Sequence, residues 1–163
     1  MNKQSIKDQT FFITGGSRGI GRATAELICM HGGNVAIADK HPDYHPIYDD
    51  YGVTKQELEK QGGQALILKM DQSKPDEIHA AVTQAANHFG GIDAACDFVR
   101  ALNHSSYLSM LEASSEDMNH ILAMHVHGSK TLYQALYPYL KHSNLGLITF
   151  IGITPEHALL PDR

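Results

Sequence analysis

The chain has 163 residues, of which 42% are hydrophobic and 19% charged, and this is the composition of an ordinary soluble globular domain. Its formal net charge is −5, and acidic and basic residues are interspersed, so the sequence indicates no basic surface for binding nucleic acid. No apolar run approaches the roughly 20 residues that cross a membrane. Only two cysteines occur, Cys29 and Cys96, so a disulfide framework is not expected and a reducing, cytoplasmic location is.

Short apolar segments alternate with helical segments along the chain. In chain order we expect a strand at 10–14, a helix at 20–33, a strand at 34–39, a loop at 40–53, a short helix at 54–63, a strand at 65–71, a helix at 73–91, a strand at 92–99, a long helix at 114–142 and a strand at 145–151. The first helix has Ile20, Ala23, Leu27 and Met30 on one apolar face. Ser73 is the expected N-cap of the third helix, and Ser114 or Ser115 that of the long one.

The expected strands are apolar on both faces, which is typical of a parallel sheet covered by helices on each side. Strict alternation of strand and helix predicts an α/β fold: a doubly wound, Rossmann-like sheet of about five strands, forming one domain over residues 1–163. The last of these strands is expected at an apolar edge of the sheet, where a bare strand promotes association.

The sharpest motif is the turn "TGGSRGIG" at residues 14–21, between the first strand and the first helix. Glycines let the backbone turn tightly and approach a pyrophosphate, and the helix directs its free N–H groups and positive dipole end at the phosphates. An acid, Asp39, ends the second strand eighteen positions beyond Gly21, where it can accept hydrogen bonds from an adenosine ribose. The sequence therefore predicts a dinucleotide site.

The choice of dinucleotide rests on three side chains. Asp39 favours NAD, because its carboxylate bonds the ribose hydroxyls and repels a 2′-phosphate. Arg18 and Lys40 flank the same position and could bind that phosphate, which leaves NADP as the alternative.

Eleven histidines are many for this length, but no cysteine or carboxylate cluster joins them at ligand spacing, so no metal site is expected.

The pattern T-G-x-x-x-G-x-G in this context resembles the short-chain dehydrogenase/reductase family. Asp71 after the third strand, "HFGGID" at 88–93 and the "PYLK" end of the long helix follow in family order, and the Pro- and His-bearing loop is similar to that of the hydroxysteroid dehydrogenase-like branch. The resemblance implies an oxidoreductase of alcohols and carbonyls. The residues expected to bind the cofactor are Gly15, Ser17, Arg18, Gly19, Ile20, Gly21, Asp39, Lys40, Asp71 and Gln72.

The catalytic positions of that family depart from its pattern here. Asp97, Phe98, Val99 and Arg100 stand where the family carries Asn-Asn-Ala-Gly, His125 stands at the position of its relay Asn, and Gly152 or Ile153 at that of its Ser, with Thr154 as the nearest hydroxyl. The family's Tyr and Lys would follow Arg163. Two Tyr-x-x-x-Lys spacings, Tyr51 with Lys55 and Tyr137 with Lys141, are expected to be coincidental.

Two functional hypotheses follow. The first is a family oxidoreductase whose catalytic part this chain lacks, so that it is truncated relative to the family and carries no catalytic residue of its own. The second is a non-catalytic nucleotide-binding or scaffold protein.

For His125 the interpretation as a histidine bonded within the core is favoured over that as a general base. Self-association through the long helix or the fifth strand is the expected protein contact.

Overall fold

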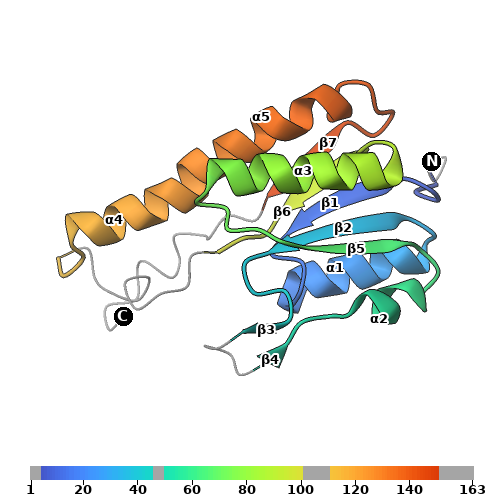
Figure 1. Cartoon of the computed structure of the whole chain (residues 1–163), viewed down its shortest axis with the longest axis horizontal. Helices are drawn as coiled ribbons and strands as arrows, with labels where there is room; N and C mark the ends of the chain where they lie inside the picture. The colour runs from blue at the N-terminus through green and yellow to red at the C-terminus, as the bar shows by residue number, and fades with distance from the viewer. Residues whose placement is uncertain (1–4, 46–49, 101–110, 151–163) are drawn as a thin grey trace.

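A parallel sheet organises the computed structural model, which describes residues 5–45, 50–100 and 111–150 (Figure 1). Its strands are β1 (Thr10–Thr14), β2 (Asn34–Asp39), β5 (Ala65–Lys69), β6 (Ala94–Asp97) and β7 (Leu147–Phe150), in the spatial order β5-β2-β1-β6-β7. Every pairing in it is parallel, with Phe12 of β1 opposite Ala36 of β2 and Ala95 of β6. The predicted five-stranded doubly wound sheet is confirmed.

Helices cover both faces of the sheet, as predicted. Helices α1 (Gly19–Met30) and α2 (Lys55–Glu59) lie on one face, and α3 (Pro75–Phe89) and α5 (Ser129–Leu140) on the other. Because strand side chains alternate, Phe11 and Ile13 of β1 join the core under α1 and α2, while Phe12 between them joins the core under α3 and α5. Both faces of the central strand are therefore fully buried.

The predicted apolar face of α1 is wrong. Ile20, Leu27 and Met30 are 65%, 55% and 61% exposed. The buried positions are Gly21, Ala25, Ile28 and Cys29. A Cβ on Gly21 would collide with the carbonyl oxygen of Gly15, so the helix can lie this close to the glycine turn only through its small residues.

Residues expected as a plain loop form a small hairpin. Strands β3 (Tyr44–His45) and β4 (Asp50–Tyr51) pair antiparallel, and the rings of Tyr44 and Tyr51 contact each other with centroids 5.3 Å apart and planes tilted by 55°. The hairpin packs on the glycine turn, since Val53 N donates to the Ser17 carbonyl at 3.0 Å. The hairpin therefore lies next to the first residues of α1.

The long helix is continuous but not uniform. It runs through α4 (Ser115–Leu122), a π-helical stretch η2 (Ala123–Gly128) and α5 (Figure 1). Ser114 caps it, because its hydroxyl accepts from Asp117 N while the Asp117 carboxylate accepts from Ser114 N, which confirms that predicted cap. The predicted Ser73 cap is wrong: Lys74 occupies that position, with Pro75 at the first turn of α3.

The order of the strands places the site. All carboxyl ends of a parallel sheet share one edge, so the glycine turn after β1, Asp39 at the end of β2, the turn after β5 and Asp97 at the end of β6 come together there. Among the described strands, β5 and β7 lie at the two sides of the sheet, and Leu147 and Phe150 of β7 are 55% and 67% exposed. The expected apolar edge strand is thus present.

Candidate functional site

The glycine turn is built for close approach. Gly15 has a φ of 63°, and a Cβ there would lie 3.0 Å from the backbone carbonyl of Phe98, so only glycine fits between β1 and the segment after β6. Helix α1 begins at Gly19, and its N-cap residue Arg18 gives no side-chain hydrogen bond to the first turn. The first N–H groups of a helix have no partner within it, and these open on the turn.

One side chain in the turn is buried without a partner. Ser17 is 0% exposed, and its hydroxyl makes no hydrogen bond in the structure. A buried hydroxyl left unpaired is costly, and a phosphate oxygen bound at the start of α1 would supply an acceptor. The residues of the turn are therefore compatible with an anionic group, and the pyrophosphate cradle stays a prediction.

Asp39 lies against the same turn. Its Oδ1 accepts from His41 N at 2.9 Å, and its Oδ2 faces Ser17 N at 3.4 Å. Two backbone groups thus fix the carboxylate beside the glycine turn while leaving it acceptor capacity, since each carboxylate oxygen has two lone pairs. The predicted role of Asp39 as an acceptor for ribose hydroxyls is compatible with these contacts and stays a prediction.

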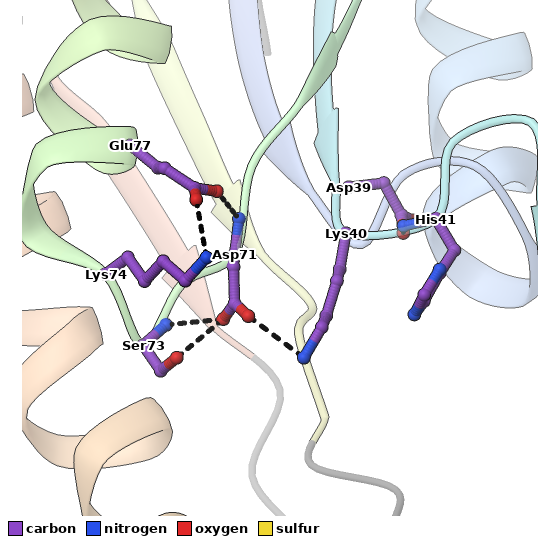
Figure 2. A network of polar contacts seen from close by, with 7 residues as sticks. All are labelled: Asp39, Lys40, His41, Asp71, Ser73, Lys74 and Glu77. Carbon is purple, nitrogen blue, oxygen red and sulfur yellow. Dashed lines mark hydrogen bonds and ion pairs between the residues drawn. The ribbon is translucent and has the colours of Figure 1, made fainter.

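The two cations that flank Asp39 are both engaged. Arg18 donates from Nη1 to the His41 carbonyl at 2.6 Å and from Nη2 to the Asp50 carbonyl at 3.1 Å, so its guanidinium ties the turn to the hairpin. Lys40 turns the other way, and its Nζ lies 2.9 Å from Asp71 Oδ2 (Figure 2). Both cations are thus bonded to groups other than the Asp39 carboxylate.

Asp71 is held from several sides. Its Oδ1 accepts from the backbone N and the hydroxyl of Ser73 at 3.0 and 2.7 Å, while its own N donates to Glu77 (Figure 2). Burial alone would raise the pKa of this carboxyl, but the bonds from Ser73 and Lys40 outweigh it and lower the pKa from 3.8 to about 2. Asp71 is therefore a fixed negative charge.

Gln72, the next residue, points away from Asp71 into a second cluster. Its Nε2 donates to both oxygens of Asp97, at 3.1 and 3.2 Å. Asp97 also accepts from the hydroxyl of Thr14 at 2.7 Å and from that of Ser129 at 2.7 Å. The buried carboxylate of Asp97 therefore ties together the ends of β1 and β6, the turn after β5 and the long helix.

Sequence reasoning missed this role of Asp97, which it treated only as a departure from a family pattern. One signal was available, namely an acid that ends an apolar strand beside the strand of the glycine turn. The partners were not readable, because Ser129 lies 32 positions along the chain and Gln72 25 positions back.

His125 lies in the π-helical stretch and is half-buried. Burial lowers its pKa, and the positive charge of Arg100 adds to that, whereas the Asp97 carboxylate acts against it. The ring is thus neutral near pH 7. It sits one helical turn before Ser129, on the side of the helix that approaches Asp97.

The other residues that the sequence singled out do not gather into one site. Phe98 packs against the core under α1 and α2. Tyr51 contacts Tyr44 while Lys55 pairs with Glu59 at 3.5 Å, so this Tyr-x-x-x-Lys spacing does not bring its two side chains together. Lys141 lies 5.9 Å above the Tyr137 ring, at the end of α5 that precedes β7 and therefore away from the carboxyl edge of the sheet. Gly152, Ile153 and Thr154 lie outside the described residues.

In the segments that the structure describes, no three or more His, Cys, Asp or Glu side chains gather in a way that could hold a metal ion. None of the helices in these segments is both long and apolar enough to span a bilayer.

Comparisons with known proteins agree on one family. The family model described as short chain dehydrogenase matches residues 9–155. A curated relative, hydroxysteroid dehydrogenase-like protein 2 from Xenopus laevis, is 33% identical over 161 residues, which cover 98% of this chain and 37% of that protein. The chain thus spans about a third of the length of the curated relatives that it matches first.

Solved structures match the fold. A short chain dehydrogenase from Mycobacterium thermoresistibile is 32% identical with a TM-score of 0.79, over 93% of this chain and 54% of that one. An NADH-dependent reductase solved with NAD is 20% identical with a TM-score of 0.72, over 83% of this chain and 53% of that one, and at this identity the likeness concerns the fold alone.

Proposed function

The chain belongs to the short-chain dehydrogenase/reductase family, and on that premise we propose that it binds a nicotinamide dinucleotide along the carboxyl edge of its sheet. The observation that carries the proposal is the buried, unpartnered Ser17 hydroxyl at the start of α1, directly beside the Asp39 carboxylate. The cofactor itself supplies hydride chemistry in this family of oxidoreductases. The residues of this chain would bind and orient it.

We assign the roles by position. Gly15, Gly19, Ile20 and Gly21 would lend backbone N–H groups and space to the pyrophosphate, with Ser17 adding its hydroxyl. Asp39 would hold the adenosine ribose, and Asp71 with Gln72 would border the adenine. NAD is favoured over NADP because Asp39 meets the 2′ position, while Arg18 and Lys40 are engaged elsewhere.

Calorimetric titration with NAD, NADP and ADP-ribose tests this. Wild-type protein should bind NAD, and Asp39→Asn should weaken that binding about ten-fold, because hydrogen bonds to a charged acceptor are worth roughly 1.5–3 kcal/mol. Asp76→Asn, in the exposed first turn of α3, is the matched control and should bind as wild type does. Absence of NAD and ADP-ribose binding by folded wild-type protein would refute the proposal.

A second role, nucleotide binding without turnover, is favoured by one observation. Of the two Tyr-x-x-x-Lys spacings in the described residues, Tyr51 and Lys55 bond other groups, and Tyr137 with Lys141 lies at the end of α5 that precedes β7, away from the carboxyl edge. Protein that binds NAD yet oxidises no secondary alcohol would support this role, and steady NADH production would contradict it. Arg100 beside His125 leads us to propose that contacts at the adenosine end outweigh those at the nicotinamide end, so that ADP-ribose and NAD bind with similar affinity.

A cytoplasmic location and self-association are also proposals. Both cysteines are free, and burial raises the pKa of each thiol to about 11, which suits a reducing compartment. The exposed apolar side chains of β7 favour association through that edge, and those of Leu122, Val126 and Tyr137 favour association through the long helix.

A further inference from the structure

In the ion pair between Lys40 and Asp71, the aspartate is held much more firmly than the lysine. The Asp71 side chain is 10% exposed, whereas that of Lys40 is 50% exposed. Ser73 fixes Asp71 Oδ1 through two hydrogen bonds, which leaves Oδ2 for Lys40 (Figure 2). The position of the pair is therefore set by Asp71, and the flexible lysine follows it.

This direction matters for the position beside Asp39. Lys40 is the next residue after Asp39, yet in Figure 2 its side chain extends toward the turn after β5 and its Nζ ends at Asp71. To reach an anion at Asp39, Lys40 would have to leave Asp71. The nearly buried carboxylate would then keep only its bonds from Ser73, and stripping a buried charge of a partner is unfavourable.

Arg18 does not replace it. Its two terminal nitrogens each donate to a backbone carbonyl, that of His41 or of Asp50, and these bonds hold the guanidinium against the hairpin. A phosphate placed beside Asp39 would meet a carboxylate from which Lys40 is turned away and an Arg18 that is fixed by bonds to the hairpin.

We propose that Asp71 is a specificity-determining residue of this site, which disfavours a 2′-phosphorylated dinucleotide by holding Lys40 away from Asp39. The inference rests on the proposed dinucleotide binding and adds to it a selecting residue that does not touch the 2′ position. NAD is then favoured over NADP for two reasons: Asp71 keeps Lys40 away from the 2′ position, and the Asp39 carboxylate repels a 2′-phosphate.

The test compares the affinities of the full chain for NAD and NADP. Asp71→Asn keeps an oxygen for Ser73 but removes the charge that holds Lys40. The ratio of the Kd for NADP to the Kd for NAD should fall about five-fold, as expected for release of a partly exposed ion pair worth about 1 kcal/mol. Any effect on adenine binding is common to both ligands and cancels in this ratio.

A double variant identifies the cause. In Asp71→Asn/Lys40→Met the gain for NADP should disappear, because the freed lysine is what binds the phosphate. Lys74→Met is the matched control, since Lys74 belongs to the same turn but pairs with Glu77 at 2.9 Å, and it should leave the ratio as in wild type. Asp71→Ser is a second charge-removing variant with the same expectation, and circular dichroism checks the fold of each.

The outcomes separate clearly. An unchanged ratio in folded Asp71→Asn and Asp71→Ser, with NAD still bound by wild type, would overturn the inference while leaving the proposed function intact. If the double variant still binds NADP better than wild type does, the inference is also overturned. The cause would then be the lost repulsion between the Asp71 carboxylate and the 2′-phosphate, and not the freed Lys40. Wild-type protein that binds neither dinucleotide would refute the proposed function first, and the inference with it.

Discussion

Asp97 offers the sharpest test of how the site edge is held together. It is 6% exposed, and its carboxylate accepts from three side chains: Thr14, Gln72 and Ser129. Asp97→Ala leaves the Thr14 hydroxyl and the Gln72 amide buried without that acceptor, at roughly 1–3 kcal/mol each. Relief from burying a carboxylate offsets part of this, so we expect a net loss of about 3 kcal/mol.

Asp97→Asn should lose much less, about 1 kcal/mol. The Asn oxygen can still accept from Thr14. Gln72 can rotate its amide so that Oε1, which has no hydrogen-bond partner in the structure, accepts from the new NH₂ group. The Ser129 hydroxyl can reverse its role as well, because a hydroxyl both donates and accepts.

Urea unfolding at pH 7, analysed by linear extrapolation, measures these free energies. Asp76→Asn on exposed α3 is the control and should stay within about 0.5 kcal/mol of wild type. The reasoning fails if Asp97→Ala loses less than about 1 kcal/mol, or if Asn is as damaging as Ala.

Two further predictions concern charge and the sheet edge. The pKa of Asp71 is lowered from 3.8 to about 2, so its carboxylate adds stability above about pH 4 that is lost as the pH falls toward 2. Between pH 5 and pH 3 wild type should therefore lose about 1 kcal/mol more stability than Asp71→Asn in urea unfolding, and parallel curves of unfolding free energy against pH would contradict this. Leu147→Lys, on the exposed outer strand, should reduce concentration-dependent association in light scattering. Leu111→Lys, at a residue 98% exposed away from the sheet, should not, and equal effects would rule out β7 as the contact.

The fold was predictable because the sheet is buried on both faces. Strands at 10–14 and 34–39 were predicted with the bounds that the structure has, since unbroken apolar runs between glycine turns have few other solutions. The packing face of α1 was not predictable from the same rule. Hydrophobicity favours Leu27 and Met30, but Gly21 and Ala25 are the residues small enough to let the helix reach the turn.

The candidate site was predictable in place but not in its bonds. Strand order alone brings Asp39 and Asp71 to one edge, because carboxyl ends of parallel strands meet there. The direction of Arg18 was not readable, because it depends on the carbonyls of His41 and Asp50 in a hairpin that was expected to be plain loop. The direction of Lys40 depends likewise on the hydrogen bonds that fix Asp71.

Asp71 and Gln72 connect the two halves of the site edge through one turn. Asp71 reaches Lys40 after β2, while the neighbouring Gln72 reaches Asp97 after β6, on the other side of β1. The turn is pressed from a third side, because a Cβ on Gly128 of the long helix would collide with the Gln72 carbonyl oxygen. A change at Asp97 that lets Gln72 shift should therefore also move Asp71 and loosen its hold on Lys40. The proposed selectivity at the ribose and the packing under the long helix would then both depend on the same pair of adjacent residues.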